Sequence, residues 1–225
     1  MDRHKENRGT VMAKVASFTF NPFQENTYVV YDETGECVIF DPGCSNKQEE
    51  TELVTFLEDK KLRPVRLINT HCHIDHILGN AFVAEQFDLG LEIHEGELQV
   101  LNQGPMVADM YGIAYNTHSP APINFIKEGS TISFGNTELK ALFTPGHSPA
   151  SLSFYDEKDQ YLIAGDVLFF QSIGRTDLPG GDFDTLAESI RTQLYVLPDE
   201  VIVYPGHGPK TRIGYEKMNN PFVKP

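Results

Sequence analysis

The sequence predicts an α/β protein in which two β-sheets pack together and helices cover their outer faces. Strand-like runs gather near both ends of the 225-residue chain, and helical patterns fall between them and before the last strand. Sheets grouped in this way bury one face against each other and the opposite face under helices. Polar residues suited to metal binding also follow directly after several strands, where open α/β sheets usually bind ligands.

The first half of the chain is expected to open with a group of strands and then alternate between strands and helices. The strand before the first polar motif is indicated by the β-branched, apolar run Val65-Arg66-Leu67-Ile68. The helix after that motif is indicated by apolar residues at 78, 82 and 83. In order, strands are expected over residues 11–20, 26–32, 37–42, 65–70 and 91–94, and helices over 47–60, 77–87 and 95–103.

The second half is expected to form the other sheet. Strands are expected over 131–134, 137–144, 151–156 and 160–165, followed by an amphipathic helix over 183–196 and a last strand over 201–204. Residues 104–123 are the least regular segment, with three prolines. Long loops in compact domains often form pocket walls, so Tyr111 and Tyr115 are candidates for the rim of a substrate pocket.

A second candidate wall is the glycine-rich segment 169–183, which carries Arg175 and Asp177. These two side chains are expected to pair and brace the segment. Arg175 is also a candidate for the substrate rim.

The run Thr70-His71-Cys72-His73-Ile74-Asp75-His76 indicates a metal site. Helical zinc motifs place histidines four residues apart, whereas the candidates here lie two apart, at 71, 73 and 75. Alternate residues share a face only in an extended chain. The motif is therefore expected to begin where the strand over 65–70 ends.

Three further candidate ligands, His147, Asp166 and His207, follow later strands in the same way. A glycine precedes each of them, which lets the backbone turn tightly. Taken alone, each histidine could be a surface residue, and Asp166 could cap a helix or form a turn. Together with the first motif, they supply imidazole and carboxylate groups at one edge, a set suited to zinc or iron.

With these residues in place, the chain resembles the metallo-β-lactamase superfamily and, within it, the short single-domain relatives of glyoxalase II (hydroxyacylglutathione hydrolase). The resemblance implies an αββα sandwich of the metallo-β-lactamase type, with one domain over residues 1–225. The polar residues 1–11 are expected to be a flexible N-terminal extension. Besides the metal residues, the resemblance rests on Glu25-Asn26-Thr27-Tyr28, Asp41-Pro42-Gly43, Gly165-Asp166-Val167-Leu168-Phe169, Gly174-Arg175-Thr176-Asp177 and Gly206-His207-Gly208-Pro209.

The resemblance also implies a site for two divalent metal ions per chain. The ligands would be His71, His73 and His147 on the first ion, Asp75, His76 and His207 on the second, and Asp166 on both. Asp41 would hold a ligand histidine in one tautomer, although Asp-Pro-Gly could also be a simple turn. Zinc is the expected metal, with iron and manganese as alternatives because all three accept histidine and carboxylate ligands.

The implied activity is hydrolysis of a thioester such as S-lactoylglutathione. Two close metal ions lower the pKa of bound water, so a bridging hydroxide would attack the carbonyl carbon. Asp75 and Asp166 are the catalytic candidates, because they would hold this metal-bound hydroxide. One metal would stabilise the oxyanion, and a thiolate leaves readily without a strong general acid.

Three alternatives stay open. A persulfide dioxygenase of this superfamily holds one iron with counterparts of His71, His147 and Asp166 only, whereas the segment around His207 favours the hydrolase. A lactone or ester hydrolase would use the same site. A non-catalytic metal-binding interaction module is disfavoured by the complete ligand set.

The thiol carrier is also open. Only 18 residues follow His207, so the carboxy-terminal helical domain that supplies glutathione contacts in full-length glyoxalase II is not expected here. The expected partner is therefore a small-molecule thioester of unassigned carrier.

Composition narrows the class further. A net charge of −14 argues against nucleic acid as a partner, because phosphate backbones require a basic surface. No apolar run approaches the ~20 residues that a membrane span requires, so no membrane partner is expected. Three cysteines without a CxxC pair indicate a reducing compartment, the cytoplasm, and Cys72 is expected to be a buried thiol facing away from the metals. The oligomeric state is not predicted.

Overall fold

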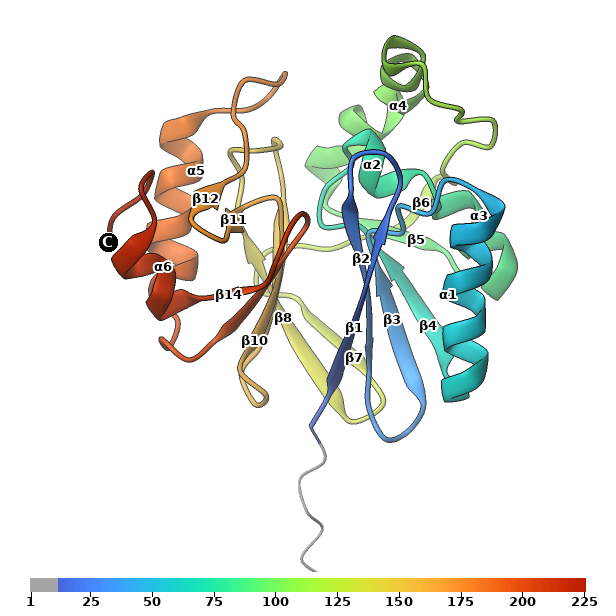
Figure 1. Cartoon of the computed structure of the whole chain (residues 1–225), viewed down its shortest axis with the longest axis horizontal. Coiled ribbons are helices and arrows are strands. Elements are labelled where there is room, and N and C mark those ends of the chain that lie inside the picture. The colour runs from blue at the N-terminus through green and yellow to red at the C-terminus, as the bar shows by residue number, and fades with distance from the viewer. Residues whose placement is uncertain (1–11) are drawn as a thin grey trace, which may run out of the picture.

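Two β-sheets face each other at the centre of the molecule, and helices cover the outer face of each (Figure 1). This computed structural model describes residues 12–225, so the predicted N-terminal extension over 1–11 lies outside the described residues. Helices α1 (Lys47–Lys60) and α3 (Asn80–Phe87) lie outside the first sheet, and α5 (Phe183–Ser189) and α6 (Ile213–Asn219) outside the second. The expected αββα arrangement is confirmed.

The first sheet has the strand order β1-β2-β3-β4-β5-β6. Its first three strands are antiparallel neighbours, and the remaining pairs are parallel because helices form the crossovers between them. The strands are β1 (Lys14–Phe20), β2 (Glu25–Tyr31), β3 (Glu36–Phe40), β4 (Arg63–Ile68), β5 (Leu91–Ile93) and β6 (Pro122–Phe125).

The second sheet has the order β14-β13-β10-β9-β8-β7. Its strands β10 and β13 are parallel, with α5 in the connection between them, and its other pairs are antiparallel. The strands are β7 (Thr131–Phe134), β8 (Thr137–Phe143), β9 (Leu152–Asp156), β10 (Tyr161–Gly165), β13 (Ile202–Pro205) and β14 (Thr211–Arg212). A small hairpin of β11 (Leu168–Phe169) and β12 (Ser172–Ile173) follows β10.

Apolar side chains form three layers of core. Between the sheets, the rings of Phe40 and Phe154 pack with centroids 5.0 Å apart. Leu57 of α1 belongs to the cluster under the first sheet, and Leu186 of α5 to the cluster under the second. Burying side chains of this size stabilises the fold by about 1.5–3 kcal/mol each. The sheets are therefore held on both faces, and their strand ends are fixed supports for the loops.

The helix expected over 77–87 is instead two helices, α2 (Ile74–Ile77) and α3. Gly79 separates them. A Cβ atom at Gly79 would lie 2.4 Å from the Cys44 sulfur and 2.8 Å from the Pro42 carbonyl oxygen. This close contact with the segment after β3 sets the break, and it is not visible in the local pattern.

The boundary expected after residue 103 is wrong, because α4 (Leu98–Tyr111) continues through Gly104 and Pro105. A short 3-10 turn, η1 (Glu95–Glu97), precedes it. The buried side chains of Leu101 and Ala108 join the cluster under the first sheet, and this packing outweighs the poor helix propensity of glycine and proline. Strand β6 also begins within the segment expected to be irregular, at Pro122.

The helix expected over 183–196 ends its regular α-helical part at Ser189 and continues as a π-helical turn, Ile190–Leu194. No helix of residues 12–225 has both the length and the apolar character needed to cross a membrane.

Candidate metal centre

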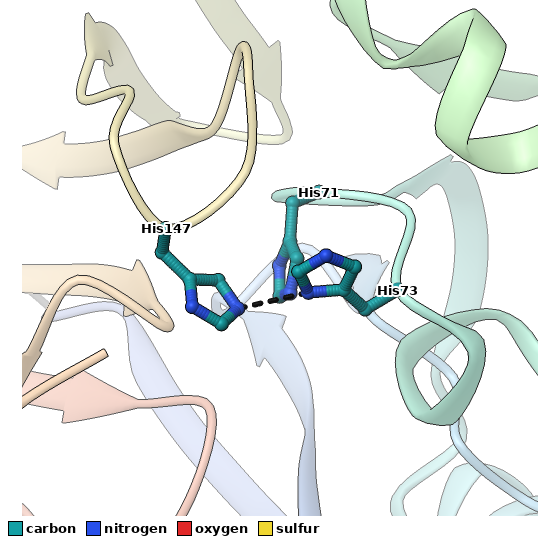
Figure 2. Close-up of side chains that lie close together, drawn as sticks. All are labelled: His71, His73 and His147. Carbon is teal, nitrogen blue, oxygen red and sulfur yellow. Dashed lines mark hydrogen bonds between the residues drawn. The ribbon is translucent and has the colours of Figure 1, made fainter. Parts of the chain in front are cut away.

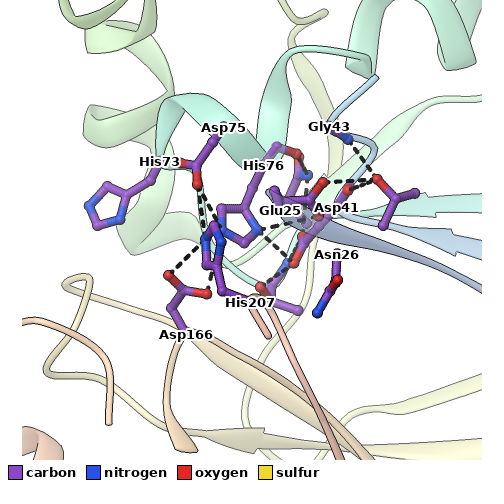
Figure 3. A network of polar contacts seen from close by, with 12 residues as sticks. Glu25, Asn26, Asp41, Gly43, His73, Asp75, His76, Asp166 and His207 are labelled. Atoms are coloured by element: carbon purple, nitrogen blue, oxygen red, sulfur yellow. Dashed lines mark hydrogen bonds and ion pairs between the residues drawn. The ribbon is translucent and has the colours of Figure 1, made fainter. Parts of the chain in front are cut away.

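The predicted ligands come together where loops that follow strands of both sheets meet (Figures 2 and 3). The first sheet supplies the motif that follows β4, with Asp75 and His76 in the short helix α2. The second sheet supplies its ligands from the ends of three strands. His147 follows β8, Asp166 follows β10 and His207 follows β13.

The first group consists of His71, His73 and His147, which each offer a ring nitrogen within 4.8 Å of the others (Figure 2). The Nδ1 atom of His73 and the Nε2 atom of His147 are 2.9 Å apart. His71 and His147 are buried, and His73 is partly buried. This group could hold one ion.

The second group consists of Asp75, His76 and His207 (Figure 3). The Nε2 atom of His207 lies 3.0 Å from Oδ2 of Asp75. Asp166 lies between the two groups, with Oδ2 3.4 Å from Nε2 of His147 and Oδ1 3.5 Å from Nε2 of His76. Its carboxylate can therefore contact ions in both groups.

The tautomers of three histidines are set by hydrogen bonds behind the site. Nδ1 of His147 donates to the carbonyl oxygen of Arg175 (2.7 Å), and Nδ1 of His207 lies 3.1 Å from the carbonyl oxygen of Phe23. Nδ1 of His76 lies 3.2 Å from Oδ2 of Asp41. Because these acceptors require a proton on Nδ1, Nε2 of each neutral ring presents a lone pair to the centre.

Several polar atoms at the centre lack partners, which tests whether a metal fits. Nε2 of His71, Nε2 of His76 and Oδ1 of Asp166 are buried without a hydrogen bond. Each such atom destabilises the folded protein by about 1–3 kcal/mol if it has no hydrogen-bond partner or metal ion. Nitrogen and carboxylate donors left free at one point match the ligand preference of zinc, iron or manganese, so the donor set fits two divalent ions.

In the metal-free site, the histidines of the first and second groups of ligands differ in protonation state. Burial lowers the pKa of His71 well below its ordinary value and that of His73 to about 3, so both rings are neutral and able to bind metal. Burial opposes the charge on His76, but the carboxylates of Asp75 and Asp166 outweigh it and raise its pKa. A metal in the second group would therefore displace a proton from His76.

Asp41 has a left-handed backbone (φ 47°), an uncommon conformation for a residue other than glycine. Its carboxylate accepts hydrogen bonds from the Thr70 amide (2.7 Å) and the Thr70 hydroxyl (2.6 Å). Since that hydroxyl donates to Asp41, its oxygen can accept a hydrogen bond from Nδ1–H of His71, 3.1 Å away. Asp41 thus contacts His76 directly and His71 through Thr70.

Two asparagines that sequence reasoning did not assign a role support the second group. Asn26 donates to the carbonyl oxygens of Pro205 and Gly208, on both sides of His207. Asn21 donates to the carbonyl oxygen of Asp75 at 2.9 Å. Asn26 belongs to the motif Glu25-Asn26-Thr27-Tyr28 at the start of β2. Its hydrogen-bond partners, however, lie far away in the sequence.

The three rim candidates have different surroundings. Tyr111 ends α4, is 53 % exposed, and packs edge-on against Phe23 with ring centroids 5.5 Å apart. The Tyr115 hydroxyl accepts a hydrogen bond from the Ser119 amide (2.8 Å), and its ring packs on the core under the first sheet. Arg175 forms the predicted pair with Asp177 through two hydrogen bonds of 2.7 Å.

Comparison with known proteins agrees with this geometry. A family model described as "Metallo-beta-lactamase superfamily" matches residues 20–207. The probable metallo-hydrolase YqgX of Bacillus subtilis is 37 % identical over 204 residues, which cover 90 % of this chain and 93 % of the relative. Hydroxyacylglutathione hydrolase GloC of Haemophilus influenzae is 36 % identical over 205 residues, which cover 89 % and 93 %. The crystal structure of TTHA1623 in a di-iron-bound form has a TM-score of 0.83 and 36 % identity, and the match covers 93 % of this chain and 100 % of that chain.

Proposed function

Because this chain belongs to the metallo-β-lactamase superfamily, we propose that it is a hydrolase with two divalent metal ions that cleaves a thioester such as S-lactoylglutathione. The observation that carries the proposal is the position of Asp166 between two complete groups of ligands. Support for the substrate class comes from the GloC relative, whose name states hydroxyacylglutathione hydrolysis.

Bound divalent ions would supply an activated water at neutral pH and a positive charge for the developing oxyanion. The protein's own groups determine where the substrate can approach. His71 and His76 are buried, whereas the side chain of His207 is 26 % exposed and that of Asp75 is 14 % exposed. We therefore place the reacting carbonyl on the side of His207 and Asp75, with Asp75 and Asp166 orienting the attacking water.

The aromatic residues next to this open side are the proposed wall for the substrate. The Phe169 ring packs edge-on against His207 at 6.3 Å, and Phe23 supports Tyr111. Arg175, whose carbonyl oxygen accepts a hydrogen bond from His147, is a further candidate for the wall, although Asp177 neutralises part of its charge. In this proposal the wall contacts the acyl group or the thiol carrier, and Tyr115 supports it from beneath α4.

A mononuclear persulfide dioxygenase is the enzymatic alternative. It would need His71, His147 and Asp166 only, whereas Asp75, His76 and His207 also converge here with their own supporting hydrogen bonds. The second group has no role in that alternative, so the geometry favours the dinuclear hydrolase. Lactone or ester hydrolysis would use the same ions and differ only in the leaving group.

The test is metal analysis of the purified protein together with turnover of S-lactoylglutathione and oxygen uptake with glutathione persulfide. Two metals per chain with hydrolysis would support the proposal. One iron with oxygen uptake would replace the hydrolase by the dioxygenase. Two metals with no hydrolysis of any of several thioesters would reject the thioester as substrate class.

Zinc as the metal and the cytoplasm as the location are part of the same proposal. The three cysteines are buried and free, and burial raises the pKa of each thiol, which makes them unreactive. Such thiols suit a reducing compartment. The acidic charge supports a small-molecule partner rather than nucleic acid.

A further inference from the structure

Glu97 is a fully buried carboxylate that sequence reasoning did not single out. It ends the turn η1, between β5 and α4, and its side chain points into the protein rather than capping the helix. Burying a charge is costly unless hydrogen bonds satisfy it. The partners of this carboxylate therefore indicate why it is there.

The described partners of the Glu97 carboxylate are N–H and O–H groups of two loops. Oε2 accepts a hydrogen bond from the Cys72 amide (2.9 Å), and Oε1 accepts one from the Ala150 amide (2.8 Å). The Ser148 hydroxyl lies 2.6 and 2.7 Å from the two oxygens and donates its single proton between them. Charge-assisted hydrogen bonds of this kind are stronger than neutral ones.

These two loops carry all three imidazoles of the first group. Cys72 lies between His71 and His73, and Ser148 directly follows His147. The loops arise from different sheets, one after β4 and the other after β8. The Glu97 carboxylate thus links the two halves of the first group from behind.

The turn that carries Glu97 is also packed tightly on the second loop. A Cβ atom at Gly96 would lie 2.6 Å from the Cβ atom of Ala150, so only glycine lets the turn approach this closely. The carboxylate is therefore held by the backbone of η1 as well as by its hydrogen bonds.

We propose that Glu97 is a positioning residue for the first metal ion, fixing the spacing of His73 and His147 by linking their loops. The inference rests on the proposed metal binding of the site. A buried group that orients ligands typically contributes 10–100-fold to metal affinity. In Glu97→Gln, the amide nitrogen would face the N–H of Cys72 or Ala150, and one of these hydrogen bonds would be lost.

The test separates the two metal positions. His207→Ala keeps the first group intact, and His73→Ala keeps the second. Zinc affinity is measured in each background, with and without Glu97→Gln, by competition with a chelator. We expect the substitution to weaken zinc binding about 10–100-fold in His207→Ala and to leave the affinity of His73→Ala unchanged.

The matched control is Glu92→Gln. Glu92 is also a buried carboxylate, five residues earlier on β5, but it pairs with Arg66 at 2.7 and 2.6 Å and not with the ligand loops. Glu92→Gln should therefore not weaken zinc binding at one of the two metal positions more than at the other. Ser148→Ala is a milder second variant that removes one donor and keeps the carboxylate, so it should weaken the first position in the same direction even if Glu97→Gln folds poorly.

Equal weakening of both positions, or no weakening, would overturn the positioning role. If the wild-type protein takes up two zinc ions and Glu97→Gln keeps both affinities, only this inference fails. If the wild-type protein takes up no zinc, the proposed function fails and this inference fails with it.

Discussion

The Nδ1 atom of His73 lies 2.9 Å from the Nε2 atom of His147, although the two rings belong to loops from different sheets. Because Nδ1 of His147 donates to the carbonyl oxygen of Arg175, its Nε2 carries no proton in the neutral ring. In the metal-free protein, the contact is therefore a hydrogen bond from His73 to His147. A bound ion would replace this hydrogen bond and use both nitrogens.

Replacing His73 by alanine removes one of the three imidazoles of the first group. We expect the zinc content to fall from two ions toward one and kcat for thioester hydrolysis to fall by about 10²–10³-fold, because the charge that stabilises the oxyanion is lost. Metal analysis and steady-state kinetics measure both effects. The control is His118→Ala, an exposed histidine that stacks on Tyr115. A His73→Ala protein that kept two zinc ions would contradict the assignment.

Replacing Asp41 by asparagine tests the carboxylate behind His76. Asparagine tolerates the left-handed backbone, so the change removes charge without adding strain. Zinc affinity should fall about 10–100-fold, because the amide cannot accept all the hydrogen bonds of Thr70 and His76. Asp88→Asn is the matched control, since Asp88 is exposed and has a similar backbone (φ 54°). Equal zinc affinities for the two variants would show that Asp41 does not act on the metal.

Tyr111→Ala tests the proposed substrate wall. Loss of the proposed contact between the ring and the substrate should raise KM about 2–10-fold, on the order of 0.5–1.5 kcal/mol, with kcat little changed. Tyr111→Phe keeps the ring and should behave like wild type. If Tyr111→Ala has an unchanged KM for every thioester that is hydrolysed, Tyr111 is not part of the wall.

Asp32 gives a pH-dependent prediction away from the metal centre. Burial alone would raise its pKa, but hydrogen bonds from Thr34, Asn136 and Thr137 outweigh burial and hold the pKa below its ordinary value. A carboxyl group whose pKa is lowered by folding contributes stability above its unfolded pKa, near 4, and loses it as the pH falls through the folded value.

The free energy of unfolding of the Asp32→Asn protein should therefore be about 2 kcal/mol lower than that of wild type at pH 7. This difference should shrink below pH ~4. Urea unfolding of both metal-free proteins across this pH range measures the effect. Asp59→Asn, an exposed position on α1, is the control. A difference that stays constant down to pH ~3 would exclude the ionised carboxylate as its source.

Local patterns predicted most of the elements. Helix α1 occupies the predicted residues 47–60, because Asn46 caps its first turn and Lys61 ends it in a left-handed conformation. The parts that could not be predicted depend on contacts between distant segments. The break at Gly79 is set by Cys44, and the continuation of α4 through Pro105 is set by packing.

In the metal site, too, local sequence patterns identified some residues, whereas contacts between distant segments determine the others. The ligand candidates could be found because chemistry restricts them to histidine and aspartate at strand ends. Asn21, Asn26 and Glu97 could not be given roles, because an asparagine or glutamate in a sequence carries no sign of which backbone groups it will meet. Phe23 was missed because its carbonyl oxygen, rather than its side chain, contacts His207.

Each sheet is built from one continuous stretch of chain, and this has a consequence for biosynthesis. The first sheet uses residues 14–125, and the second uses residues 131–212. At typical ribosome speeds, His207 is made on the order of ten seconds after His76. Until His147 is made, the motif after β4 has four metal-binding side chains and no ligands from the second sheet, and the set is complete only with His207. The nascent chain can therefore meet cellular metal before its binding site exists, and capture of the ions in their final places must wait until the two halves have docked.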